Sequence, residues 1–297
     1  MKTKLSGIDA IYWINLDRST DRKQSMETMF QDAEFADIPK IRITAIDGKN
    51  ADISKILRDT PLIKTPCEYA CTLSHLEAIR QFAETDAEIA LILEDDVCLD
   101  FKPYWRKSLQ EVMSAAPQDW DILQLCYITD EIGIHLFDST DYIKYIRPQH
   151  LFSTAAYIIT NRAAKKLIQD VYQDGKYCLG TNIRHEADTF LYMKCRTYTY
   201  KYPFFIYHTN NDSLIHPDHL DLHERSKKLV EEMMRKPDNP HYYYYYYYMF
   251  LGLLILFIIL GNSYFNIGLE KLGRSFIPQY IKDFTISWKS VLPIDVL

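Results

Sequence analysis

The sequence predicts an α/β domain built on a central sheet that helices cover. Short apolar runs alternate with segments of helical periodicity, a pattern typical of layered α/β folds. With 297 residues, 47% of them hydrophobic, the chain is long enough for one large domain and an appendage. The apolar runs are rich in β-branched and aromatic residues, as interior strands are, and cover residues 10–16, 41–46, 89–93, 122–125 and 155–160.

The segments between these runs are expected to be helical. Asp21, followed by Gln24, matches a capping box at the start of one helix. Thr72 is expected to cap a second helix, in which leucine, isoleucine and phenylalanine recur on one face. Asn161 is expected to cap a third helix, and residues 186–194 form a shorter one.

Polar side chains directly follow two of the predicted strands. INLDRSTDR (14–22) ends the first, and LILEDDVCLD (91–100) places three successive carboxylates after the third. Ligands gather at the carboxyl ends of strands in such sheets, and a desolvated carboxylate without a partner is costly. The triplet therefore predicts a site for a hard divalent cation such as Mg²⁺ or Mn²⁺. Strand alternation would place Glu94 and Asp96 on one side and Asp95 on the other.

Several motifs follow one another along the chain up to about residue 215. They are INLDRSTDR (14–22), ITAIDG (43–48), CTLSHLEAIR (71–80), ALILEDDV (90–97), WDILQL (120–125), TAAYIITNRAAKKLI (154–168) and EADTFL (186–191). In this order they resemble glycosyltransferase family 25, which includes bacterial lipopolysaccharide β-galactosyltransferases and collagen hydroxylysine galactosyltransferase domains. The resemblance implies a GT-A-like, Rossmann-type nucleotide-sugar-binding domain with a mixed central sheet. It also implies a nucleotide-sugar donor, usually UDP-galactose, and inversion at the anomeric carbon.

The resemblance assigns the metal and diphosphate function to the acidic triplet. Asp96 is expected to be a direct metal ligand for Mn²⁺ or Mg²⁺, joined by Glu94. Glu94 or Asp95 would otherwise contact the ribose or hold the metal ligands in position without binding the metal. His208, in the closing stretch of the resemblance, is either a further metal ligand or a loop histidine.

The opening motif is expected to form the nucleotide side of the pocket. Asn15 and Arg18 would line it, and Arg22 would reach the base or the phosphates, because an arginine fork suits phosphate oxygens. The alternative is that these arginines pair at the surface with Asp17 or Asp21.

Three further residues have expected roles. His75 either contacts the donor or is a hydrogen-bonded core residue. An inverting transfer needs a general base, for which Asp188 is the candidate and Glu186 its competitor. A carboxylate that merely complements the dipole of its helix is the alternative.

The carboxyl-terminal part of the chain differs in composition. Residues 242–269 contain no charged side chain, and tyrosines precede the apolar centre. We expect a catalytic domain over 1–222, a helix and linker over 223–241, a transmembrane helix over 242–261 and a short tail over 262–297. A buried or interfacial helix is the alternative. Because no signal-peptide-like segment opens the chain, the catalytic domain of this single-pass protein is expected on the cytoplasmic side.

The net charge and the cysteine content argue against two kinds of partner, a nucleic acid and a zinc ion. The net charge of −6 and the scattered basic residues predict no nucleic-acid partner. Of six cysteines, Cys67 and Cys71 are close together, but without a second pair this spacing predicts reduced thiols and no zinc site.

The expected partners are a nucleotide-sugar donor and a glycan, glycolipid or glycoprotein acceptor. The alternatives are a catalytically silent binder or membrane scaffold of the same fold, and a nucleotidyltransferase that uses the same acidic site. The acidic triplet favours an enzyme, because a scaffold has no need of a costly acidic cluster.

Overall fold

The computed structural model divides into two compact units, Met1–Pro237 and Asp238–Leu297. All elements described below belong to the first unit. The structure describes residues 3–60, 64–129, 140–145, 151–181, 184–208 and 220–235, together with 248, 251 and 252.

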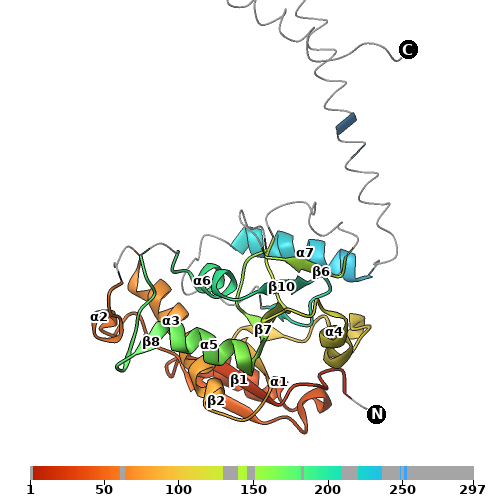
Figure 1. Ribbon diagram of the computed structural model, residues 1–297. Helices are drawn as coiled ribbons and strands as arrows, with labels where there is room; N and C mark the ends of the chain where they lie inside the picture. Colours follow the sequence, from red (N-terminus) through yellow and green to blue (C-terminus); the bar gives the residue numbers. More distant parts are fainter. Residues whose placement is uncertain are drawn as a thin grey trace, which may run out of the picture. The chain divides into compact units, whose positions relative to one another are not determined.

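A seven-stranded mixed sheet forms the centre of the first unit (Figure 1). Its strands are β1 Ala10–Asn15, β2 Lys40–Thr44, β3 Ile89–Glu94, β5 Ile122–Gln124, β6 Tyr142–Lys144, β7 Ala156–Thr160 and β10 Thr197–Tyr200. They lie in the order β2-β1-β3-β7-β5-β10-β6. β1 is parallel to β2 and β3, whereas β7 is antiparallel to both of its neighbours. The mixed sheet and the five strand positions expected from the sequence are confirmed.

The helices are α1 Thr20–Met29, α2 Ile53–Ile56, α3 Pro66–Ala83, α4 Leu109–Ala115, α5 Asn161–Val171, α6 Ala187–Lys194 and α7 Leu220–Arg235, with short 3₁₀ turns at Ala33–Phe35 and Lys102–Tyr104. Two small antiparallel pairs complete the unit: β4 Val97–Cys98 with β11 Ile206–Tyr207, and β8 Tyr172–Gln173 with β9 Lys176–Tyr177. Helices α3 and α5 pack against each other, as Figure 1 shows.

Alternation along the strands divides the hydrophobic core into two clusters, one on each face of the sheet. On β1, Ile11 and Trp13 belong to one cluster, and Tyr12 and Ile14 belong to the other. The first cluster includes residues of α4 and α7, and the second includes residues of α3, α5 and α6. Both faces of the sheet are therefore covered, which explains why its central strands are apolar throughout.

Helix α7 belongs to this core. Its Val230 is fully buried, and the Ser226 hydroxyl accepts a hydrogen bond of 2.9 Å from the Thr129 amide. Tyr207 donates through its hydroxyl to the carbonyl of His223 in the same helix. This helix therefore belongs to the compact unit Met1–Pro237, and the expected boundary of the catalytic domain at 222 stays a prediction.

The second helix begins earlier than expected. Thr65 caps α3 and forms a capping box with Glu68, and a proline follows directly at position 66. Thr72, the expected cap, lies inside the helix and donates to the carbonyl of His185. This longer helix carries Cys67 and Cys71 on the turns that precede His75.

The caps of two other helices also differ from expectation. Ser19 precedes α1, so Asp21 lies within its first turn and forms no cap. Thr160 caps α5 through the Ala163 amide. Asn161 donates instead to the carbonyls of residues 82 and 85, which ties α5 to the end of α3.

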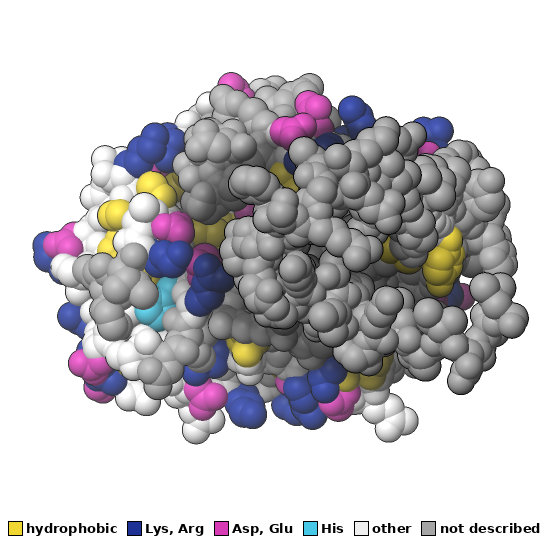
Figure 2. All heavy atoms as spheres, turned by 90° about the horizontal axis from the view of Figure 1, so that it is seen from above, with side chains coloured by type: hydrophobic (Ala, Val, Ile, Leu, Met, Phe, Trp, Pro, Cys, Tyr) yellow, Lys and Arg dark blue, Asp and Glu magenta, His cyan; other side chains and the backbone are white. Residues whose placement is uncertain are grey.

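The surface of the described residues carries many ion pairs. Figure 2 shows Lys or Arg side chains intermixed with Asp and Glu on the face seen from above.

Within the described residues, no helix combines the length and apolarity needed to cross a bilayer. The expected transmembrane helix over 242–261 lies outside the described residues apart from 248, 251 and 252.

Candidate active site

The carboxyl ends of β1, β2 and β3 meet at one edge of the sheet. In the register of these strands, Asn15 lies beside Thr44, and Ile14 lies beside Glu94. A pocket opens at this edge, against the first half of α3. Its polar lining comprises Asn15 at the end of β1 with Arg18 and Arg22 beyond it, Asp47 and Lys49 after β2, Glu94 at the end of β3 with Asp95 and Asp96 beyond it, and Cys67, Cys71, Ser74 and His75 of α3.

The chain turns directly after Glu94. Strand β3 ends at this residue, and Asp95 and Asp96 form a turn that leads into β4. All three carboxylates line the pocket. Glu94 contacts His75 of α3, whereas Asp95 contacts Arg22 of α1, so the two carboxylates face different helices.

Asp95 is held by residues of β1 and α1. The Asn15 amide donates to Asp95 Oδ2 at 2.6 Å, and Arg22 Nη1 donates to Asp95 Oδ1 at 2.9 Å. Both oxygens are thus engaged by the protein, which gives Asp95 a structural task. Burial disfavours the charge of Arg22, but the carboxylates of Asp96 and Asp95 raise its pKa overall.

Arg42 is a site residue that sequence reasoning missed. Its Nε and Nη2 atoms donate to Asn15 Oδ1 at 3.0 and 2.7 Å, and Nη2 also donates to Asp17 Oδ1 at 2.6 Å. Arg42 therefore orients the Asn15 side chain so that its amide group faces Asp95. The sequence does contain a signal for this role, because Arg42 is the only charged residue in the predicted strand 41–46.

Asp96 differs from Asp95 because one of its oxygens has no donor. Asp96 Oδ1 is buried and accepts no hydrogen bond within the described part of the chain. Arg22 Nη1 lies 3.8 Å from the other oxygen. Burial and the charge of Glu94 raise the pKa of Asp96 to about 7. A buried carboxylate oxygen without a hydrogen-bond donor is costly, and a proton or a cation would satisfy it. Asp96 Oδ1 therefore fits as an oxygen ligand for a hard divalent metal.

Glu94 is held by α3 and by the turn before β7. His75 Nε2 lies 3.2 Å from Glu94 Oε1, and Thr154 donates to the same oxygen at 2.8 Å. Burial alone would raise the pKa of Glu94, but His75 and Thr154 lower it overall. His75 is itself almost fully buried, and its Nδ1 lies 3.2 Å from the Tyr157 hydroxyl. It is thus a hydrogen-bonded core residue that also lines the pocket.

His208 lies beside Asp96 through its backbone. Its amide donates to the Asp96 carbonyl at 2.8 Å, which extends the pairing of β11 with β4. Burial lowers the pKa of the His208 imidazole. Among the described residues, the potential ligand atoms that gather within 4.8 Å of one another belong to Cys71, His75 and Glu94. The expected set of Glu94, Asp96 and His208 does not converge in the same way.

Asp188 lies in the first turn of α6 and is partly buried. It accepts hydrogen bonds from the amides of Ser153, at 3.2 Å, and Thr189, at 2.6 Å. Burial raises the pKa of Asp188. Ser153 has a φ of 94°, a left-handed conformation that is strained for a residue with a side chain. Because Thr154 follows directly and binds Glu94, this turn connects the Asp188 carboxylate to the pocket.

Glu186 is engaged in ion pairs. Lys64 Nζ lies 2.6 Å from its Oε1 atom, and Arg184 Nε lies 3.4 Å from the same atom. Burial opposes ionisation, but the bond from Lys64 and the charge of Arg184 lower the pKa of Glu186 overall. A paired carboxylate of low basicity is a poorer proton acceptor than Asp188.

Arg18 and the loop after β2 form the opposite wall. Arg18 pairs with Asp47 at 2.9 Å, so its partner is neither Asp17 nor Asp21. The Arg18 guanidinium holds the pKa of Asp47 at about 2. The next residue, Gly48, packs so closely on α3 that an added Cβ would lie 2.6 Å from the Cα of Cys67.

Comparisons with known proteins identify the same family that the sequence motifs resemble. The family "Glycosyltransferase family 25 (LPS biosynthesis protein)" matches residues 8–177, which include the strand-end residues of the pocket. Procollagen galactosyltransferase 1 of Danio rerio is 26% identical over 185 residues, which are 57% of this chain and 30% of that protein. A glycosyltransferase 25 family member of Anopheles gambiae is 28% identical over 187 residues, again 57% and 30% of the two chains. The chain thus spans less than a third of the length of these relatives.

Among solved structures, a glycosyltransferase involved in the glycosylation of the major capsid of PBCV-1 aligns with 56% of this chain and 68% of its own. The sequence identity is 9% and the TM-score is 0.32, too low to bear on the fold. Asp188 and His208 lie beyond the residues that the family matches.

Proposed function

The chain belongs to glycosyltransferase family 25, and on this premise we propose that it transfers galactose from UDP-galactose to a hydroxyl group. The names of the procollagen galactosyltransferases among its relatives support the choice of sugar. The acceptor is a hydroxyl of a glycan, a lipid-linked glycan or a protein. The uncharged segment 242–261 supports attachment of this enzyme to a membrane.

One observation carries the proposal: the motifs shared with the family converge on a single pocket. INLDR, AIDG and LEDD are far apart in the sequence, yet they supply neighbouring walls of this pocket at the ends of three adjacent strands. Ligands of α/β sheets bind at such edges. Arg18, Arg22 and Lys49 supply positive charge for a diphosphate, and the carboxylates supply oxygens for a cation.

Asp96 is the residue that would hold Mn²⁺ or Mg²⁺. Its buried Oδ1 has no donor among the described residues, and the nearby Glu94 adds negative charge. When bound, a divalent cation supplies charge that stabilises the departing nucleoside diphosphate. The protein contributes the fixed position of this carboxylate, because Asn15 and Arg22 hold the preceding residue in the turn.

Asp188 is the proposed general base. It would take the proton of the acceptor hydroxyl while that oxygen forms its bond to the anomeric carbon and the bond from this carbon to the diphosphate breaks. Attack from the face opposite the diphosphate inverts the configuration. The raised pKa of Asp188 suits it to accept a proton, and two backbone amides fix its orientation.

A donor screen tests the proposal on the full chain. Thermal stabilisation and hydrolysis are measured with UDP-, GDP- and CMP-sugars, each with and without Mn²⁺. We expect UDP-galactose to stabilise the protein only with metal, and the variant Asp96→Asn to lose this response. Asp100→Asn serves as the matched control, because Asp100 pairs with Lys227 and does not line the pocket.

The same screen distinguishes the alternatives. Equal stabilisation of Asp96→Asn would overturn the metal assignment. Nucleotide binding without turnover on any acceptor would identify a silent binder. Transfer of the nucleoside monophosphate of the donor, with release of sugar 1-phosphate in place of UDP, would identify a nucleotidyltransferase.

A further inference from the structure

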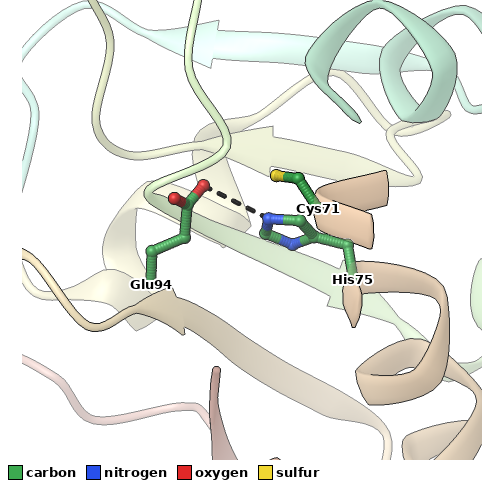
Figure 3. A group of neighbouring side chains, drawn as sticks. All are labelled: Cys71, His75 and Glu94. Carbon is green, nitrogen blue, oxygen red and sulfur yellow. Dashed lines mark hydrogen bonds and ion pairs between the residues drawn. The ribbon is translucent and has the colours of Figure 1, made fainter. Parts of the chain in front are cut away.

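Three side chains of different chemistry converge on the α3 side of the pocket. Cys71 and His75 lie one turn apart on α3, and Glu94 faces them from the end of β3 (Figure 3). One ligand atom from each of these residues lies within 4.8 Å of the other two. A thiol, an imidazole and a carboxylate are the three side-chain ligands that zinc takes in proteins.

The separation of two of these ligand atoms is close to that of tetrahedral coordination, and the third lies within 4.8 Å of both. Zinc bonds of about 2.3 Å to sulfur and about 2.1 Å to nitrogen or oxygen place neighbouring ligand atoms about 3.4–3.6 Å apart. His75 Nε2 and Glu94 Oε1 are 3.2 Å apart, so a small movement of either side chain would admit a cation between them.

The ligands are also supported from behind, as metal ligands in proteins usually are. His75 Nδ1 lies 3.2 Å from the Tyr157 hydroxyl, which orients the ring so that Nε2 faces Glu94. Thr154 holds the Glu94 carboxylate at 2.8 Å. Cys71 and His75 share one face of α3, because residues four apart on a helix lie one above the other.

We infer that Cys71, His75 and Glu94 form a binding site for a soft divalent cation such as Zn²⁺. The site takes three protein ligands and keeps a fourth position for water, because all three residues line the open pocket. Binding displaces the thiol proton of Cys71, so the thiolate and the Glu94 carboxylate together balance the charge of the cation. Thiolate and imidazole ligands distinguish this site from the all-oxygen preference of Mg²⁺ and Mn²⁺.

The consequence for activity rests on the proposed function. Glu94 contributes negative charge beside Asp96, and a cation on the α3 side would neutralise that charge and occupy part of the pocket. Zn²⁺ at this site would therefore inhibit the transferase, and a chelator would restore it. Metal binding itself does not depend on the identity of the reaction.

Cobalt(II) provides a direct test on the full chain. Co²⁺ bound by a thiolate produces a sulfur-to-metal charge-transfer absorption, and tetrahedral Co²⁺ absorbs strongly in the visible. We expect wild type to show both bands, Zn²⁺ to abolish them by competition, and Cys71→Ser to lose the charge-transfer band with an affinity at least about 10-fold lower. Cys67→Ser is the matched control, because Cys67 lies one turn earlier on α3, lines the same pocket and is not part of the group.

Two further measurements complete the test. Asp96→Asn should retain the charge-transfer band, because Asp96 does not belong to this group. Zn²⁺ inhibition is scored for each variant against its own zinc-free activity, and circular dichroism verifies folding. Absence of the band in wild type, its persistence in Cys71→Ser or its equal loss in Cys67→Ser would overturn the inference. None of these results depends on whether the chain transfers a sugar, so failure here is distinguishable from failure of the proposed function.

Discussion

The amide of Asn15 donates to Asp95 Oδ2 at 2.6 Å across 80 positions of sequence. This bond joins the end of β1 to the turn after β3, and Arg42 fixes the Asn15 side chain from β2. The three strands that supply the pocket are thus tied together by polar contacts at their carboxyl ends, where the hydrophobic core no longer holds them.

Asn15→Ala should loosen this connection. The substitution leaves Asp95 Oδ2 without its Asn15 donor, and a partly unsatisfied buried carboxylate costs about 1–3 kcal/mol of unfolding free energy. We expect that loss in urea denaturation, together with weaker binding of UDP-galactose. Gln24→Ala is the control, because Gln24 is an exposed amide residue on α1 and should change neither measurement. A wild-type stability for Asn15→Ala would show that the bond is dispensable.

The pKa of Asp96 predicts a pH dependence of stability in the metal-free chain. The folded-state pKa is raised to about 7 from an ordinary value of 3.8, so the folded protein binds this proton more tightly than the unfolded chain does. The protonated Asp96 carboxyl makes its full contribution to stability below pH 4, and this contribution is lost as pH rises through 7. Asp96→Asn cannot ionise, so its stability relative to wild type should grow over this range by up to about 4 kcal/mol.

Urea denaturation of both proteins in EDTA, at a series of pH values, measures this difference. Saturating Mn²⁺ should remove the gain in relative stability that Asp96→Asn shows with rising pH, because a bound cation favours the ionised carboxylate of wild type. A difference that does not vary with pH would show that Asp96 is not the titrating group.

Gly48→Ala should displace the loop after β2. The added Cβ would lie 2.6 Å from the Cα of Cys67 and 2.7 Å from the carbonyl oxygen of Pro66, and backbone atoms cannot rotate away. Overpacking of this kind costs about 1–3 kcal/mol, measurable as a lower midpoint of thermal unfolding. Donor affinity should fall as well, because Asp47 and Lys49 move with the loop. Gly252→Ala is the control, since among the described residues no atom outside its own helix backbone and chain neighbours lies within 4 Å of its added Cβ.

The two candidate bases can be separated by kinetics. Asp188→Asn should lower kcat by about 10²–10⁴-fold with a smaller effect on KM, because it removes proton transfer and keeps the shape of the side chain. Glu186→Gln should retain kcat within a few-fold, since Glu186 is engaged by Lys64. The opposite ranking would assign the base to Glu186. Thermal unfolding of both variants verifies that the folds are intact.

The strands of the sheet were predictable because they are buried on both faces, which imposes long apolar runs on the sequence. The strand-end residues were predictable for a related reason, since polar groups directly after such a run mark a change from core to pocket. The helix starts were less predictable. Thr65 and Glu68 form the capping box of α3, yet Thr72 offered an equally plausible hydroxyl nearer the apolar face.

The group formed by Cys71, His75 and Glu94 shows what sequence reasoning did not bring together. The rule applied to Cys67 and Cys71 sought a second pair of cysteines or histidines. The spacing of Cys71 and His75 was visible, but the third ligand comes from a strand. The approach of Glu94 to α3 depends on the packing of this helix on the sheet.

The sequence by itself determined which kinds of side chain lie at the carboxyl ends of β1, β2 and β3, because hydrophobic periodicity locates the strands. Only the tertiary structure decided what each carboxylate does. Donors from β1 and α1 satisfy both oxygens of Asp95, whereas Asp96 keeps one oxygen without a donor among the described residues. Strand register, helix packing and the turn after Glu94 place these donors, and such long-range geometry leaves no local pattern in the sequence.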